Sequence, residues 1–152
     1  MTERLDLEGF DTRPAVLTRE WVVTVDTPEG GVAPILQALE RELSLRQGPY
    51  DCCSFVRRNG YQRFRALAGS HAGDEGTVQQ TPAAQIVFSI PPDRALLAQV
   101  FELLFAVHVN EEPTVRVTEA WGSRSKLLDD KDNPNRYGNR PDADSLHGVS
   151  VG

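Results

Sequence analysis

Residues 84–121, AQIVFSIPPDRALLAQVFELLFAVHVNEEPTVRVTEAW, hold the pattern that decides the fold. Ala84–Ile90 is a nearly continuous apolar run, which suits a strand in the centre of a sheet. Pro91–Asp93 opens a helix, and Thr114–Trp121 then alternates apolar and polar side chains as a strand does. We therefore predict a strand, a helix and a second strand in this order.

The helix in this stretch carries more apolar surface than one packed face needs. One of its two apolar stripes consists of Leu96, Val100, Leu103, Leu104 and Val107, and the other of Leu97, Phe101 and Phe105. We expect the first stripe to lie on the sheet. The second is then covered by loops, by the N-terminal segment or by another subunit.

The N-terminal half predicts a strand followed by a helix. Trp21–Val25 alternates with the period of a strand and is followed by Asp26, Thr27 and Pro28. Thr27 can cap a helix that has Pro28 in its first turn. Because glycine weakens that turn, we expect the regular helix from about Ala33 to about Arg46.

Two β-prone runs come next, Tyr50–Arg58 and Gly60–Leu67, and Asn59-Gly60 between them is a strong hairpin signal. Residues 68–82 are expected to form a mobile connection. With the hairpin taken as one excursion of the sheet, the order is β-α-β-β-α-β. The prediction is an α+β, ferredoxin-like sandwich with an extended β-hairpin and two helices on one face of a mainly antiparallel sheet.

The length of 152 residues suits one domain with a substantial core. We divide the chain into an irregular lead-in (1–18), the sandwich (19–122) and a polar tail or oligomerisation arm (123–152). In the tail, residues 129–135 resemble a calcium loop without its glycine and distal glutamate, so a flexible acidic tail is the default interpretation. Tyr137 and Leu146 are its sparse apolar anchors.

Composition narrows the function classes. No segment approaches the roughly 20 apolar residues of a membrane span, and the N-terminus lacks the pattern of a signal peptide, so we expect a cytoplasmic protein without a membrane partner. A net charge of −6 argues against sequence-independent nucleic-acid binding. Cys52 and Cys53 are neighbours on a predicted strand, point to opposite faces and are interpreted as small buried side chains rather than a disulfide.

The first candidate site is the segment from His108 to Pro113 at the end of the second helix. Neutral His108 with Glu111 and Glu112 can bind a divalent metal ion, the one cofactor the sequence suggests, and His108 or Glu111 can act as a general acid or base. In the alternative interpretation His108 satisfies the last helix carbonyls and Asn110 takes a left-handed cap conformation.

The second candidate site is a local cationic patch on the predicted hairpin, with Tyr50 beside it. Its arginines are Arg57, Arg58, Arg63 and Arg65. They can hold the phosphate or carboxylate of a small anionic ligand through paired contacts. The alternative is a solvated ribbon that resists aggregation or pairs with acidic residues of a neighbouring subunit. Gly30-Gly31 before the first helix is a weaker anion signal.

Several motifs together carry a family resemblance over roughly Arg19–Arg124. They are Tyr50–Phe55, Gly60, Arg63-Phe64, Gly69, Gly73, Gly76 and His108–Pro113. The chain resembles the inserted domain of the YqfO-like NGG-interacting-factor family as a stand-alone protein; that domain is similar to CutA and, more distantly, to PII proteins. The resemblance implies a ferredoxin-like fold and a homotrimer.

The chain also departs from that family. The family usually has Pro and Tyr where this chain has Val109 and Asn110, so a role for those two side chains does not carry over. Only three histidines are present, and the separate two-metal domain of the larger family members is lacking, so their hydrolase chemistry does not carry over either.

Three functions follow for testing. The first is a trimeric module, more plausibly not an enzyme, that binds a small ligand or divalent metal at a subunit interface. The second is a small cofactor-independent isomerase, cyclase or hydrolase that uses His108 or Glu111. The third is a protein-interaction scaffold.

Overall fold

The computed structural model describes residues 3–71, 73, 75–126, 131, 133, 136, 139 and 140–148. Residues 19–122 form one compact unit, and residues 1–18 and 123–152 form another. The calcium-like stretch 129–135 lies outside the described residues except for Lys131 and Asn133, and so does Tyr137. The candidate sites all lie in the unit 19–122.

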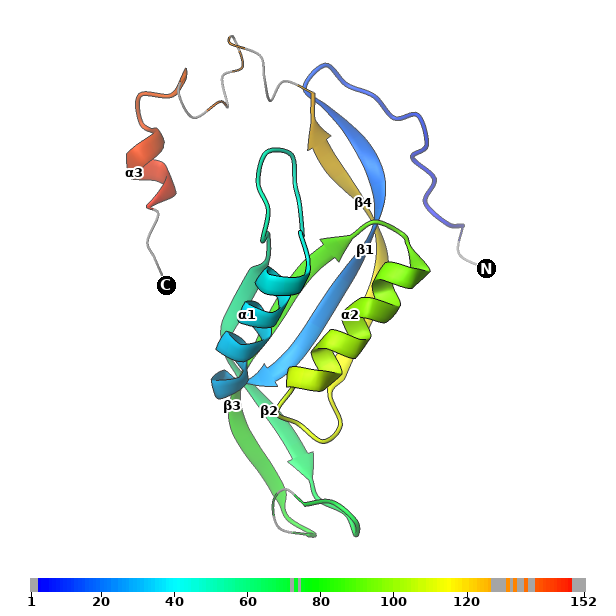
Figure 1. Ribbon diagram of the computed structural model, residues 1–152, viewed down its shortest axis with the longest axis vertical. Helices are drawn as coiled ribbons and strands as arrows, with labels where there is room; N and C mark the ends of the chain where they lie inside the picture. The colour runs from blue at the N-terminus through cyan, green and yellow to red at the C-terminus, as the bar shows by residue number, and fades with distance from the viewer. Residues whose placement is uncertain are drawn as a thin grey trace. The chain divides into compact units, whose positions relative to one another are not determined.

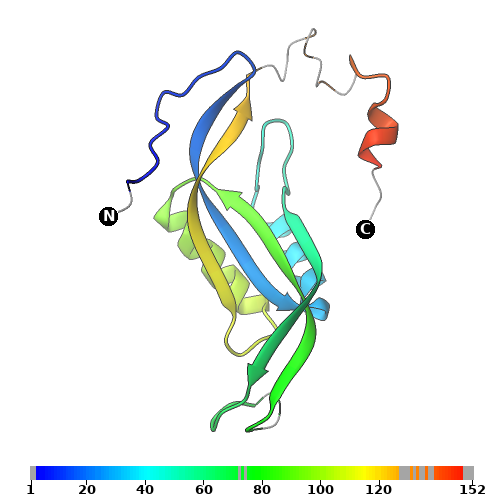
Figure 2. The same cartoon turned by 180° about the vertical axis from the view of Figure 1, so that it is seen from behind.

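The elements follow the β-α-β-β-α-β order. They are β1 (Ala15–Pro28), the 3-10 turn η1 (Glu29–Gly31), α1 (Val32–Glu42), β2 (Phe55–Arg65), β3 (Val78–Ile90), α2 (Arg94–Val107), β4 (Thr114–Ser125) and the short α3 (Ala143–His147). The sheet order is β2-β3-β1-β4, and β3 runs antiparallel to both of its neighbours. Figure 1 shows α1 and α2 on one face of this sheet, and Figure 2 shows the other face without a helix. The predicted α+β, ferredoxin-like fold is confirmed.

The core lies between the central strands and the two helices. On β1 and β3, Val23 pairs with Phe88 and Val25 with Ile86, and all four side chains are buried. The helices contribute Ile35, Leu39, Val100 and Leu104, which are buried as well. Because burial of apolar surface is the main favourable term in folding, this cluster fixes the two helices on the sheet.

The first helix begins at Val32, close to the predicted Ala33, but its cap and its end differ from the prediction. Thr27 does not cap it: its hydroxyl donates to the backbone oxygen of Pro28, and η1 leads into the helix instead. Gly31 is buried there, and a Cβ atom at this position would collide with the side chain of Thr27. This glycine therefore serves close packing, which leaves the weak anion signal at Gly30-Gly31 without support.

The same helix ends at Glu42 rather than near Arg46, because the next residues leave the helix to fill the core. Leu43 is extended, and both Leu43 and Leu45 are buried. Leu45 adopts a left-handed backbone with φ of 45°, which costs an aliphatic residue energy that its burial offsets.

The second helix follows the prediction more closely. The side chain of Asp93 accepts hydrogen bonds from the backbone N–H groups of Ala95 and Leu96, as an N-cap residue does. In the second apolar stripe, the rings of Phe101 and Phe105 stack with centres 6.1 Å apart, and Phe105 remains half exposed. Among the described helices, none is long and apolar enough to cross a membrane.

The predicted pairing of Tyr50–Arg58 with Gly60–Leu67 is wrong, because Asn59-Gly60 is not a turn. The extended hairpin is formed by β2 and β3, and β3 begins at Val78, within the connection predicted for residues 68–82. Phe55–Arg65 is one continuous strand that pairs with β3, and residues 66–77 connect the two. The pairing shifts between Arg57 and Gly60, where Asn59 has φ of 67°, so these residues form a β-bulge. Asparagine tolerates the left-handed backbone conformation, which occurs both in a tight hairpin turn and in this bulge. The dipeptide alone therefore does not distinguish a turn from a bulge.

The segment before this strand is a tight loop rather than a strand. Gln47 and Tyr50 exchange two backbone hydrogen bonds, and the backbone N–H of Cys52 donates to the oxygen of Ser44. Cys52 itself is exposed with φ of 53°. The interpretation of Cys52 and Cys53 as buried side chains on opposite faces of a strand is therefore wrong.

Candidate functional site

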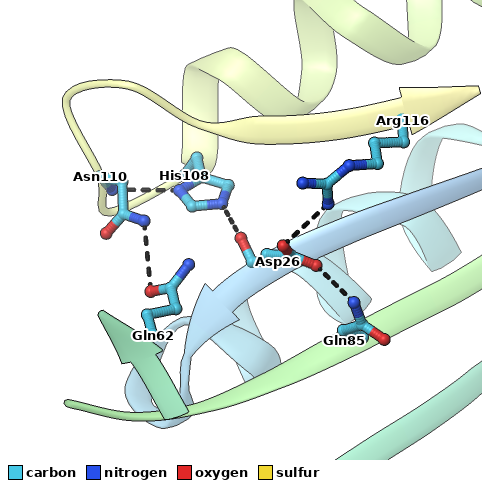
Figure 3. Close-up of polar contacts among 6 residues, drawn as sticks. All are labelled: Asp26, Gln62, Gln85, His108, Asn110 and Arg116. Carbon is cyan, nitrogen blue, oxygen red and sulfur yellow. Dashed lines mark hydrogen bonds and ion pairs between the residues drawn. The ribbon is translucent and has the colours of Figure 1, made fainter. Parts of the chain in front are cut away.

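His108 ends α2 and binds the backbone on both sides of its ring (Figure 3). Its Nε2 lies 2.7 Å from the backbone oxygen of Asp26, and its Nδ1 lies 3.0 Å from the backbone nitrogen of Asn110. The Asn110 N–H can only donate, so Nδ1 is the acceptor and Nε2 carries the proton that it donates to Asp26. His108 is therefore a neutral imidazole with both nitrogens engaged.

The alternative interpretation of this segment holds only in part. The backbone N–H of His108 donates to the carbonyl of Leu104 in the last turn of its helix, whereas its ring contacts a carbonyl at the end of β1. Asn110 does not adopt a left-handed conformation, since the described non-glycine residues with positive φ are Leu45, Cys52 and Asn59. His108 thus ties the end of α2 to the neighbouring strand.

The described residues do not fit a metal ion. Among them, no group of three or more His, Cys, Asp or Glu side chains lies close enough to hold one. Within the predicted set, His108 has no free lone pair, and Glu111 turns to His71, from whose backbone it accepts a hydrogen bond of 3.0 Å. His71 Nδ1 also lies 3.3 Å from the same Glu111 oxygen, and Glu112 is exposed. The structure does not bring His108, Glu111 and Glu112 together as ligands.

Asp26 organises the strands beneath His108 (Figure 3). One of its carboxylate oxygens accepts a hydrogen bond of 2.8 Å from Nε2 of Gln85 on β3, and the other lies 3.1 Å from Nη1 of Arg116 on β4. With the contact from His108 to its backbone, Asp26 joins three strands and the end of a helix. Sequence reasoning treated Asp26 only as the end of a strand, although a carboxylate after an apolar run was the available signal.

A concavity of about 210 Å³ opens beside Asp26, at the β-bulge. Three small residues, Gly60, Ala83 and Ala84, leave this space. A Cβ atom at Gly60 would lie 3.3 Å from the backbone oxygen of Ala83, so glycine also allows the two strands to approach closely here. The hollow therefore lies at the bulge, where small side chains and the close approach of the two strands leave space.

Two of the predicted ligand-binding arginines line this concavity. Arg58 forms an ion pair of 2.7 Å with Glu29, whereas Arg57 lies 5.8 Å from the ring centre of Phe55 and pairs with no acidic side chain among the described residues. The lining does not include Arg63 or Arg65, which lie further along β2, or Tyr50. Tyr61 and Gln62 line it instead, and sequence reasoning did not select them.

The exposed thiol of Cys52 is not an activated nucleophile. Desolvation by the surrounding loop and the nearby carboxylates of Asp51 and Glu40 raise its pKa. A higher pKa lowers the thiolate fraction at neutral pH. We therefore assign it no catalytic role.

The comparisons with known proteins agree with this architecture. No family model and no curated protein matches the chain. Solved structures that resemble it include a Bacillus cereus protein related to NIF3 (TM-score 0.58, 21% identity, 73% of this chain covered) and CutA1 from Oryza sativa (TM-score 0.51, 18% identity, 70% covered). The chain has a CutA-like fold.

The two similarities differ in how much of the other protein they span. The CutA-like chain covers 84% of the Oryza sativa protein but only 28% of the Bacillus cereus protein. At these identities the likeness concerns the fold alone. Any activity must therefore be argued from the side chains of this chain.

Proposed function

We propose that this CutA-like chain is a non-enzymatic module that binds a small anionic ligand in the concavity at the β-bulge. The observation that carries the proposal is Arg57, an exposed guanidinium at a hollow that forms no ion pair with any described residue. Guanidinium groups bind carboxylate and phosphate through two parallel hydrogen bonds, and this geometry adds specificity.

The anion is a better candidate than a metal ion. One similar structure is that of the divalent ion tolerance protein CutA1 from Ehrlichia chaffeensis, at 13% identity and a TM-score of 0.50. In this chain, however, the described acidic and histidine side chains form no cluster that could hold a cation. The enzyme alternative has similarly little support, since His108 and Glu111 do not line the concavity.

The proposal includes a homo-oligomer, with a trimer favoured and the ligand near a subunit contact. Three features support it: the helix-free face of the sheet (Figure 2), the half-exposed Phe105, and the position of β2 at the edge of the sheet. Exposed apolar surface and an unpaired strand edge both favour association. Light scattering coupled to size-exclusion chromatography should give a mass of three chains, and a monomer would contradict this part.

The ligand site is tested by thermal unfolding with inorganic phosphate, sulfate, acetate and L-lactate. A ligand that binds only the folded state raises Tm. We expect at least one anion to do so, and Arg57→Gln to abolish the rise. Arg63→Gln is the matched control, because it removes the same charge from the same strand outside the concavity. An equal rise in the Arg57 variant would refute the site.

A further inference from the structure

The outer part of the β2–β3 hairpin carries positive charge without a counter-charge beside it. Figure 1 shows both strands extending beyond α1 and α2 at this end. Arg63 and Arg65 lie on the outer part of β2, and both are exposed. Neither forms an ion pair with an acidic side chain in the described part of the chain. The neighbouring strand, β3, contains no charged residue at all.

The two arginines point to the same side of the ribbon. They are two positions apart on one strand, and their partners in the ladder are Gln80 and Val78 of β3. At about 3.3 Å per residue, they are spaced by about 6.6 Å along the strand. Every second side chain of another strand has the same spacing. A strand alongside β2 can therefore place one acidic side chain opposite each arginine.

The backbone of β2 is open on the side away from β3. Among the described strands, β3 is its only neighbour in the sheet. An edge strand presents unpaired N–H and C=O groups with which a further strand can pair. Extended peptides bind to sheet edges in this way, with main-chain hydrogen bonds for affinity and side chains for specificity. The arginines of β2 disfavour a basic strand at this edge and favour an acidic one.

The sheet edges of a second copy of the chain offer a poor match in charge. The other edge strand, β4, carries Arg116 and Arg124 but a single acidic residue, Glu119. Pairing of β2 with β2 would bring arginines together without any acidic residue. Like charges directly opposite each other destabilise a pair of strands. An acidic segment of another protein is the better complement.

A single-stranded nucleic acid also fits this surface less well than a peptide. Its phosphates match the guanidinium groups, but it has no backbone amides to pair with the open edge of the strand. The net charge of −6 also opposes the approach of a polyanion. The open edge therefore favours a peptide.

We propose that the outer edge of β2 binds an acidic segment of a partner protein as an additional strand. One acidic side chain pairs with Arg63 and the next but one with Arg65. The residue between them lies beside Phe64, which points to the other side of the ribbon and is 38% exposed. The partner segment therefore has the pattern acidic, apolar, acidic. Neither arginine lines the concavity, so this inference does not depend on the proposed anion site.

Fluorescence anisotropy of the full chain with short labelled peptides tests the inference. The probe GVEVEVG has the required pattern, and GVKVKVG has the opposite charge. A third peptide, GVEVEVG with N-methylated backbone amides, keeps the side chains but cannot donate hydrogen bonds to a strand. We expect GVEVEVG to bind about tenfold more tightly than either control peptide.

Substitutions on β2 test the two arginines. Arg63→Gln and Arg65→Gln should each weaken the binding of GVEVEVG about threefold to fivefold, because each removes one cross-strand charge pair. Arg94→Gln is the control, since it removes an exposed arginine from α2 and should leave the binding unchanged. Equal losses in all three variants would show a general effect of charge and overturn the site.

A charge exchange provides a second readout. The double variant Arg63→Glu with Arg65→Glu should bind GVKVKVG about tenfold more tightly than GVEVEVG. Both positions are exposed, and a gain in binding to the lysine peptide cannot come from an unfolded chain without an ordered edge. An unchanged preference for GVEVEVG would contradict the assigned charge pairs.

Three further results would overturn the proposal. The first is the absence of saturable binding of GVEVEVG. The second is equal binding of its N-methylated form, which would leave charge attraction without an added strand. The third is tighter binding of an oligothymidylate than of GVEVEVG, with loss in the Arg63 and Arg65 variants, which would assign the surface to single-stranded nucleic acid.

Discussion

β2 and β3 are neighbours in one sheet, yet they differ in almost every physical respect. From Ala83 to Val87, β3 pairs with a strand on each side, and from Ala84 to Ile90 it buries alternate residues against the helices. β2 lies at the edge, carries four arginines and no acidic residue, and is interrupted by a bulge. One strand supplies apolar packing, and the other supplies charge and an irregular shape.

The difference shows how one sheet can keep its stability in a central strand and its exposed charged groups in the neighbouring edge strand. The central strand cannot change without a cost in stability, because its side chains fill a close-packed core. The edge strand can carry exposed arginines and a bulge because it needs to pair on one side only. Ligand chemistry is therefore expected at the edge, and stability at the centre.

The largest effect is expected in the centre. Ile86→Ala on β3 should lower the free energy of unfolding by about 2–5 kcal/mol, since it leaves a cavity at a fully buried position. Val78→Ala, at the exposed end of the same strand, should change it by less than about 0.5 kcal/mol. Urea unfolding measures the free energy of unfolding of both variants. Similar losses would show that the central and outer parts of β3 do not differ in their contribution to stability.

A smaller effect is expected at the turn before α1. Gly31→Ala should cost about 1–3 kcal/mol, because the new methyl group would collide with the buried side chain of Thr27. Gly30→Ala is the matched control, since a Cβ atom there meets nothing within 4 Å. Thermal unfolding of the two variants would contradict the packing role of Gly31 if their Tm values agreed.

The smallest effect concerns the loop that leads into the edge strand. In a Cys53→Ser background, Cys52 should react with iodoacetamide at pH 8 more slowly than free cysteine, because its pKa is raised. Asp51→Asn should accelerate the reaction by removing one of the charges that raise this pKa. Mass spectrometry follows the rate, and no acceleration would exclude Asp51 as a cause.

Much of the fold could be predicted from local patterns. The apolar run Ala84–Ile90, the cap at Asp93 and the alternation in Thr114–Trp121 each depend on interactions within a few residues, and the structure has a strand, a helix and a strand there. The prediction of a turn at Asn59-Gly60 was wrong because it depended on local sequence alone. The dipeptide fixes a backbone conformation, and only pairing with a distant strand decides whether that conformation makes a turn or a bulge.

The site was harder to predict because it depends on contacts between distant residues. His108 meets the backbone of Asp26 across 82 positions of the chain, and Asp26 meets Arg116 across 90. No spacing rule in one sequence encodes such pairs. The arginines were visible as a group, but only the structure separates Arg57 and Arg58, at the concavity, from Arg63 and Arg65.

The bulge at Asn59 also acts as a joint between two registers. On one side of it Val56 faces Ile86 in the core, and on the other side Tyr61 faces Pro82. Between Arg57 and Gly60 the edge strand advances three residues while β3 advances two, so the bulge holds one extra residue. Residues that face each other in a ladder share a side of the sheet, so both segments of β2 keep their side relative to β3. The edge strand thus accommodates an inserted residue without disturbing the core.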